Sequence, residues 1–170
     1  MLSFWLAKKL IGGDCLGTQY ETAHMKVVVG AGIILVRCTE NSTQYLLLKG
    51  CTSGIWSFSK GHTETVDNGS ALRTAVRETQ EETGLRAGID YDIIGNSIRF
   101  GKRPYWIGVV RGDPTVVLSQ NEHTEAQWFT REEIIALNSN MDVRDWIKRS
   151  NGDRFIQLLS SGIPDRRLTA

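Results

Sequence analysis

The run from Arg77 to Leu85, Arg-Glu-Thr-Gln-Glu-Glu-Thr-Gly-Leu, constrains this chain more than any other segment. Residues three and four apart are neighbours on an α-helix, so Glu78, Glu81 and Glu82 are predicted to converge on one spot. Three carboxylates placed together repel one another unless a cation lies between them. Mg²⁺ and Mn²⁺ prefer oxygen ligands of this kind, so we interpret the helix as a metal site rather than an ordinary solvated helix face.

The segment upstream of this helix strengthens that interpretation. Residues 56–64 read Trp-Ser-Phe-Ser-Lys-Gly-His-Thr-Glu and are followed by turn-forming residues. With the Arg77–Leu85 run, they resemble the Nudix box: a glycine, five residues, a glutamate, seven residues, then Arg-Glu-aliphatic-any-Glu-Glu-any-Gly-aliphatic. The second half of that pattern matches, with Thr79 at the aliphatic position. Members of the family hydrolyse nucleoside diphosphates linked to another moiety, which implies the same class of reaction here.

The first half of the box departs from the family pattern. Gly61 lies sixteen residues before Arg77, where the family has fourteen, and Gly69 stands where the family has its first glutamate. A two-residue insertion in the turn before the helix would be accommodated as a longer loop at little cost in free energy. Asp67 and Glu64 are two candidate substitutes for the missing glutamate, and the helix glutamates are unaffected.

The motif Lys60-Gly61-His62 and the glutamate helix are similar to those of asymmetric diadenosine tetraphosphate hydrolases, with Ser59 in place of the proline of that subfamily. The resemblance covers about residues 27 to 137. It implies an α/β fold, a Nudix-type α/β/α sandwich with a mixed β-sheet between helices. It also implies a metal-dependent pyrophosphohydrolase that cleaves dinucleoside polyphosphates by attack of water on a phosphorus. The alternatives are mRNA decapping, another nucleoside-diphosphate-linked substrate, and a catalytically silent domain that senses nucleotides.

The resemblance also implies roles for individual residues. The catalytic residues would be Glu78, Glu122 and Arg77, and the metal ligands would be Gly61, Glu78, Glu81, Glu82 and Glu122. Glu122 lies six residues before a tryptophan, as the loop glutamate of the family does, and is therefore preferred to Glu125. Either Glu122 or a helix glutamate would act as the general base. Arg77 would orient a helix glutamate through a charge-assisted hydrogen bond.

A second set of residues would hold the substrate. The candidates for the phosphate chain are basic or imidazole side chains near the box and on a predicted turn: Lys60, His62, Lys102, Arg103 and His123. Phe100 and Tyr105 flank that turn and would offer rings on which a nucleobase stacks. The ordinary alternative is a solvated surface position for the polar residues and a core position for the aromatic ones.

Composition limits the partners. With 170 residues and a formal net charge of +1, the chain is long enough for one domain with a sizeable core and lacks the excess of Lys and Arg typical of polyanion binders. We expect a small nucleotide substrate, with capped RNA only under the decapping alternative, and a monomer. No apolar run approaches the roughly 20 residues that span a bilayer, so no membrane partner is expected.

Three cysteines without metal-ligand spacing indicate reduced thiols and a cytoplasmic location.

The domain organisation is predicted to be simple: an N-terminal extension over residues 1–24, a Nudix hydrolase domain over 25–160 and a C-terminal tail over 161–170. The first eleven residues are apolar and basic without acids, so mitochondrial import is an alternative to a cytoplasmic location.

Strands are predicted at 26–37, 45–49, 91–94, 97–100, 104–111 and 126–129, with a short piece at 116–118, and a loop over 50–59. Helices are predicted at 70–83, from a capping box at Thr130 to 137, and at 143–159. Ser70 is the expected N-cap of the glutamate helix and Gly84 its C-cap.

Overall fold

The structure is a computed structural model and describes residues 30–149. Its strands are β1 (Gly30–Cys38), β2 (Thr43–Gly50), β3 (Trp56–Ser57), β4 (Ser59–His62), β5 (Tyr91–Phe100), β6 (Arg103–Val110) and β7 (His123–Thr130). Its α-helices are α1 (Ala71–Thr83), α2 (Arg131–Ala136) and α3 (Met141–Arg149), and a 3₁₀ helix, η1 (Thr65–Asp67), precedes α1. In this part of the chain, no helix is long and apolar enough to cross a membrane.

The strands form one mixed sheet with β1 at its centre. β1 pairs in parallel with β6, from Gly32 opposite Tyr105 to Val36 opposite Val109, and the other strand pairs are antiparallel. On its other edge, β1 pairs with β4 along its first half and with β2 along its second half, and β7 pairs with β2. This splitting of partners places β4 beside the start of β1.

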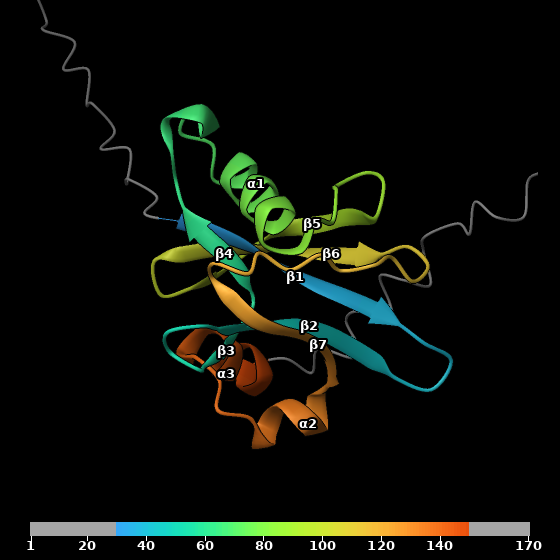
Figure 1. The fold of residues 1–170 in the computed structure, drawn as a ribbon. Coiled ribbons are helices and arrows are strands. Elements are labelled where there is room, and N and C mark those ends of the chain that lie inside the picture. Colours follow the sequence, from blue (N-terminus) through green and yellow to red (C-terminus); the bar gives the residue numbers. More distant parts are fainter. Residues whose placement is uncertain (1–29, 150–170) are drawn as a thin grey trace, which may run out of the picture.

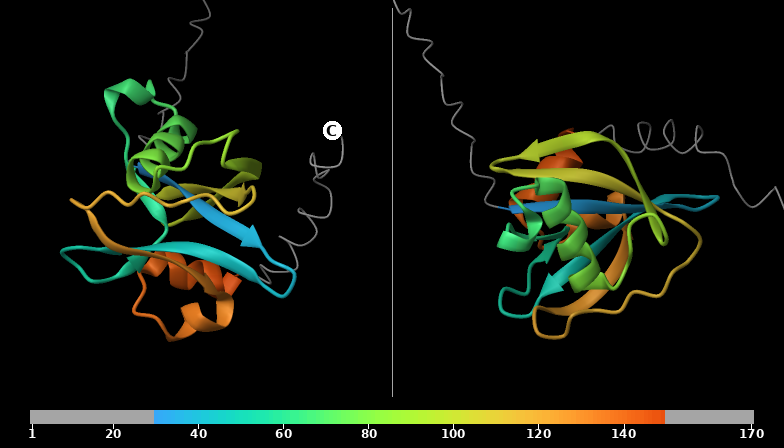
Figure 2. Two further views of the ribbon diagram at one scale, coloured as in Figure 1. Left: turned by 45° about the vertical axis from the view of Figure 1, so that its right-hand side comes forward. Right: turned by 90° about the horizontal axis from the view of Figure 1, so that it is seen from above.

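Helices cover the sheet on both faces: α1 lies on one side and α2 and α3 on the other (Figures 1 and 2). Successive side chains of a strand point to opposite faces, and those of β1 are buried on both. Ile33 and Leu35 pack in the cluster beneath α1, whereas Ile34 and Val36 pack with α2 and α3. The α/β/α sandwich with a mixed sheet that the sequence predicted is therefore confirmed.

The helix termini follow the predicted local signals. The Ser70 side chain accepts a hydrogen bond from the backbone N–H of Arg73 at the start of α1, and Gly84 ends the helix with φ of 73°. Thr130 and Glu133 form the reciprocal capping box at the start of α2. Glycine adopts the left-handed conformation after a helix without steric cost, which is why the end of α1 at Gly84 could be located from the sequence.

Several strand predictions are wrong in detail. The two strands expected at 91–94 and 97–100 are one strand, β5, whose register shifts between Ile94 and Ile98 at Gly95, where φ is 66°. The piece at 116–118 is not a strand, because its backbone is bound to the end of α1: the N–H of Val117 donates to the carbonyl of Thr83. The expected loop at 50–59 contains β3 and the start of β4, and β7 begins at His123 rather than at 126.

The remaining predictions on the termini lie outside the described residues. These are the extension at 1–24, strand residues 26–29, helix residues 150–159 and the tail at 161–170.

Candidate active site

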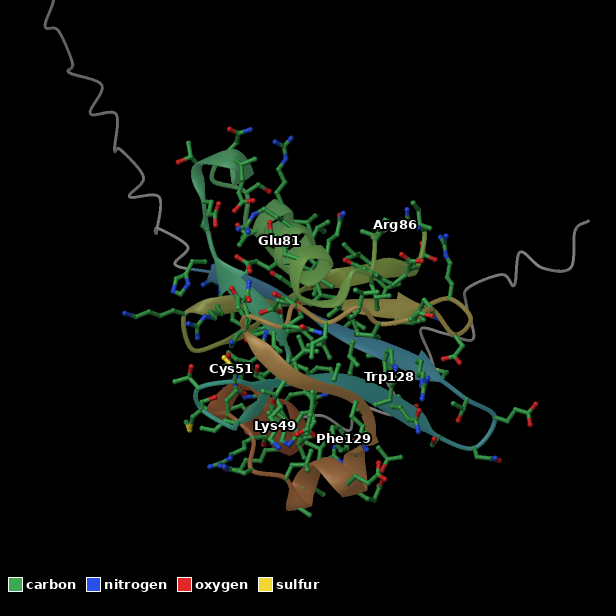
Figure 3. All side chains as sticks on the ribbon, in the orientation of Figure 1. Lys49, Cys51, Glu81, Arg86, Trp128 and Phe129 are labelled. Atoms are coloured by element: carbon green, nitrogen blue, oxygen red, sulfur yellow. The ribbon has the colours of Figure 1, made fainter. Side chains whose placement is uncertain are left out.

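The glutamates of α1 divide into two that face the protein and one that faces solvent. Glu78 and Glu82 are buried, with exposed fractions of 9% and 3%, whereas the side chain of Glu81 is 58% exposed. Glu81, labelled on α1 in Figure 3, instead forms an ion pair with Arg77, one helical turn earlier. The distance between Nη1 of Arg77 and the carboxylate is 2.8 Å. Two of the three carboxylates are therefore buried and the third is exposed, and the convergence of all three on one spot stays a prediction.

Glu78 lies against the backbone of β4 at Gly61. A Cβ placed on Gly61 would lie between 1.9 and 2.2 Å from the carboxylate atoms of Glu78, so only glycine leaves room for this carboxylate. Burial raises the pKa of Glu78; the nearby Arg77 guanidinium opposes that shift, and the neighbouring carboxylates of Glu82 and Glu81 add to it. Glu78 is thus a buried acid for which ionisation is costly unless a cation is present.

Glu82 links α1 to two strands. One carboxylate oxygen accepts a hydrogen bond from the backbone N–H of Lys60 on β4 at 3.0 Å. The other lies 3.0 Å from Nε2 of His123, the first residue of β7, which is itself buried. One carboxylate of α1 therefore contacts both β4 and β7.

Arg77 is the centre of an ion-pair network between α1, the turn before it and the end of β4. Its guanidinium donates to both carboxylate oxygens of Asp67 at 3.1 Å and to the carbonyl of His62 at 2.8 Å. It also lies 3.0 Å from Oε1 of Glu78. Arg77 therefore connects the end of β4, the turn before the helix and the buried glutamate.

Asp67, and not Glu64, is the acid of the turn that is buried in this network. The Asp67 side chain is 2% exposed and also accepts hydrogen bonds from the Thr74 hydroxyl and the Glu64 N–H, both at 2.9 Å. The Glu64 carboxylate is 64% exposed and lies 3.7 Å from Arg77. Hydrogen bonding from Arg77, partly offset by burial, lowers the pKa of Asp67 from 3.8 to about 2.

Gly69 has a backbone reason to replace glutamate. It adopts φ of 72° directly after Asn68 at φ of 51°, so the longer turn ends in two left-handed residues. A glutamate would be strained there, whereas glycine is not.

Glu122 lies on the loop that precedes β7 and is exposed. Its ligand atom, with those of Glu82 and His123, forms a group whose members all lie within 4.8 Å of one another. The Glu122 carbonyl accepts a hydrogen bond from the N–H of Cys51 at 2.9 Å, which fixes the loop beside β2. Glu125 is instead paired with Lys49 at 2.7 Å, so the geometry favours Glu122 over Glu125 for a role at the site.

The predicted phosphate-binding residues lie at one end of the sheet. Gly32 of β1 is opposite Lys60 on one side and opposite Tyr105 on the other, so the end of β4 and the turn before β6 flank the start of β1. His62 and Lys102 are exposed, while Arg103 is partly buried and lies 3.9 Å from Asp142 of α3. His123, by contrast, is buried against Glu82 rather than open to a phosphate.

The aromatic residues expected to stack on a base are core residues, so that prediction is wrong for this structure. Phe100 and Tyr105 are 1% and 0% exposed, and their ring centroids lie 5.6 Å apart. The Tyr105 hydroxyl donates to Asp142 at 2.6 Å, and burial is the main cause that raises its pKa. The buried face of α3, which includes Trp146, packs over Phe100 and leaves neither ring open to a ligand.

The fold and the glutamate helix together define the class of this protein as a Nudix domain. The family described as NUDIX domain matches residues 27–149. The chain therefore belongs to the Nudix family and is a Nudix hydrolase.

Curated relatives make the likeness more specific. The asymmetrical bis(5'-nucleosyl)-tetraphosphatase of Sus scrofa is 32% identical over 120 residues, which are 65% of this chain and 80% of the relative. The protein of the same name from Mus musculus is 32% identical over 113 residues, 61% of this chain and 76% of the relative. The similarity to asymmetric diadenosine tetraphosphate hydrolases that the motifs indicated is thus confirmed.

Solved structures show the same fold. A C. elegans Ap4A hydrolase in a binary complex superposes with a TM-score of 0.62 at 21% identity, covering 78% of this chain and 98% of that one. The Nudix hydrolase RenU of M. smegmatis gives a TM-score of 0.60 at 14% identity, covering 81% and 88% of the two chains.

Proposed function

We propose that this Nudix hydrolase is a Mg²⁺- or Mn²⁺-dependent pyrophosphohydrolase of dinucleoside polyphosphates, with a tetraphosphate-bridged dinucleotide as its substrate. The observation that carries the proposal is the meeting of two buried helix glutamates, Glu78 and Glu82, with β4 and the loop of Glu122. The names of the curated relatives support the choice of substrate.

The groups at this site fit a hard divalent ion. Glu78, Glu82, Glu122 and the carbonyl of Gly61 offer only oxygen ligands, and the missing Cβ of Gly61 opens the strand to the Glu78 carboxylate. Glu81 would join them only by leaving its ion pair with Arg77. The bound ion would neutralise phosphate oxygens and lower the pKa of the attacking water.

The side chains have separate tasks in this proposal. Glu122, exposed on its loop, accepts the proton of the attacking water. Arg77 holds Glu78 against β4. Lys60 and His62 at the end of β4, with Lys102 and Arg103 across β1, bind the phosphate chain and keep it extended along this end of the sheet.

Turnover of a nucleotide panel tests the proposal. The protein would be incubated with Mg²⁺ and one substrate at a time: diadenosine tetraphosphate, a diphosphate-linked nucleotide or a capped RNA. The products would then be separated by chromatography. We expect diadenosine tetraphosphate to be cleaved fastest into a nucleoside monophosphate and a nucleoside triphosphate. Faster release of a capped nucleotide from RNA would favour decapping. The absence of turnover on every substrate, despite nucleotide binding, would favour a sensor.

Replacing Lys102 and Arg103 together by alanine is expected to separate long from short substrates. A well-formed hydrogen bond to a charged group contributes roughly 1.5 to 3 kcal/mol, so the loss of one should raise KM about tenfold to 100-fold. Only a tetraphosphate chain carries phosphates far enough from the helix glutamates to reach this turn. KM should therefore rise for diadenosine tetraphosphate and stay within about twofold for a diphosphate-linked nucleotide.

A matched control removes two charges from the opposite end of the molecule. Arg86 and Arg111 form surface ion pairs with Asp90 and Asp92, respectively. Arg111 directly follows β6 at the end opposite Arg103, and Arg86 lies beyond the end of α1 (Figure 3). The double alanine variant of these arginines should leave both KM values unchanged. An equal rise for both substrates in the Lys102 and Arg103 variant would contradict a role for this turn in chain-length selection.

A further inference from the structure

The contact between Glu82 and His123 joins two buried side chains that are 41 residues apart in sequence. Their side chains are 4% and 8% exposed, and Nε2 of His123 lies 3.0 Å from Oε1 of Glu82. The second oxygen of Glu82 is already bonded to the backbone N–H of Lys60. Each oxygen of this carboxylate thus faces a nitrogen, one from β4 and one from β7.

The other ring nitrogen of His123 identifies the tautomer. Nδ1 is buried and has no hydrogen-bond partner among residues 30–149. A proton on Nδ1 would be a buried donor without an acceptor, and it would leave the Nε2 lone pair facing the lone pairs of a carboxylate. A proton on Nε2 avoids both costs and donates to Glu82. The surroundings therefore favour His123 as a hydrogen-bond donor to Glu82.

We propose that His123 is a positioning residue, which orients Glu82 for metal binding by donating from Nε2 and contributes no nitrogen to the ion. The inference rests on the proposed metal site. The closeness of the ligand atoms of Glu82, Glu122 and His123, within 4.8 Å, would also suit a site with one imidazole ligand. Ligation through Nε2, however, would move the proton to Nδ1, and a metal-bound histidine ordinarily gives its other N–H to an acceptor, which the described residues do not provide.

This assignment has a consequence for metal choice. With His123 donating to Glu82, the ligands left for the ion are the oxygens of Glu78, Glu82, Glu122 and Gly61. An all-oxygen shell favours Mg²⁺ and Mn²⁺, whereas an imidazole ligand would favour softer ions such as Zn²⁺. His123 therefore affects metal selectivity, because its Nε2 is engaged with Glu82 and is not a ligand of the ion.

Mn²⁺ binding to the full chain without nucleotide tests the inference. Electron spin-echo spectroscopy of the Mn²⁺-loaded protein detects a directly bound ¹⁴N, and we expect none. Titration followed by the signal of free Mn²⁺ gives the affinity. His123→Leu fills the space of the imidazole without offering a hydrogen-bond donor. It should weaken Mn²⁺ binding about 10-fold to 100-fold, as changes to groups that orient metal ligands do. His123→Gln places an amide N–H where Nε2 stands and should keep the affinity within about threefold.

Controls separate positioning from folding and from the choice of substrate. Glu125→Gln changes an exposed carboxylate on the same strand and should bind Mn²⁺ like the wild type. A ¹⁴N coupling in the wild type that disappears in His123→Gln, or an unchanged affinity in folded His123→Leu, would overturn the inference. If His123→Leu fails to fold, the wild-type spectrum and His123→Gln still decide. Because nucleotide is absent, a protein that binds Mn²⁺ as expected but cleaves no polyphosphate would reject only the proposed substrate.

Discussion

Replacing Glu78 by glutamine is expected to lower kcat for diadenosine tetraphosphate about 1,000-fold while leaving the metal-free protein at least as stable as the wild type. The loss of a metal ligand removes several kcal/mol of charge stabilisation from the transition state, and each 1.36 kcal/mol is a factor of ten in rate. Glutamine has nearly the same shape as glutamate and still offers an oxygen to Arg77, which lies 3.0 Å from the present carboxylate.

The stability half of this prediction follows from the direction of the pKa shift. Burial is the main cause that raises the pKa of Glu78 above its ordinary value. A raised pKa means that the folded state prefers the protonated form, so the contribution of this group to stability falls as the pH rises through its folded pKa. Ionising this carboxylate is therefore a cost to the metal-free fold, and neutral glutamine removes that cost.

Steady-state kinetics measure the loss of kcat, and urea denaturation in the presence of a metal chelator measures the stability of the metal-free protein. Glu125→Gln is the matched control, because it removes an exposed carboxylate that is paired with Lys49. We expect its kcat and stability to equal those of the wild type. Glu81→Gln should show an intermediate loss of activity, since Glu81 is exposed and bound to Arg77. Near-normal turnover by Glu78→Gln would mean that this glutamate is not a metal ligand.

The sequence predicted features that depend on neighbouring residues. The glutamate helix, its Ser70 and Gly84 caps and the capping box at Thr130 all lie where expected, because each is determined by a few adjacent side chains. The sandwich fold could be inferred from the order of elements and from the motif. The choice of Glu122 over Glu125 stays a prediction: Glu125 is paired with Lys49, whereas Glu122 lies near Glu82.

The rest depends on contacts between segments far apart in the chain. Phe100 and Tyr105 flank a basic turn and suggested a base platform, but α3, more than 35 residues later in the chain, supplies Asp142 for the Tyr105 hydroxyl and buries both rings. The pairing of Glu82 with His123 likewise requires β7 to lie beside α1. No local pattern carries such information, although a histidine beside the loop glutamate was a signal for closeness to the site.

The insertion before α1 leads to the second large effect. Asp67 is the one acid of the turn that is buried, and its carboxylate receives three kinds of donor: the Arg77 guanidinium, the Thr74 hydroxyl and the Glu64 backbone N–H. Replacing it by alanine would leave Arg77, whose side chain is 17% exposed, without its main partner. Breaking a buried ion pair by removing one member costs about 3 to 5 kcal/mol, so Asp67→Ala should be destabilised by about that amount.

The pH dependence of unfolding distinguishes the ion pair from simple loss of packing. Because the pKa of Asp67 is lowered from 3.8 to about 2 in the folded protein, its contribution is present above pH 3.8 and is lost as the pH falls toward 2. The shift corresponds to about 2 kcal/mol. Urea midpoints measured between pH 5 and pH 2 should therefore fall less steeply in Asp67→Asn, which keeps the shape of the side chain without its charge. Glu64→Gln, at an exposed carboxylate 3.7 Å from the same arginine, should follow the wild-type curve. If Asp67→Asn also followed it, Arg77 would not depend on Asp67 for its position, and the glutamate missing from the first half of the Nudix box would have no structural substitute in this turn.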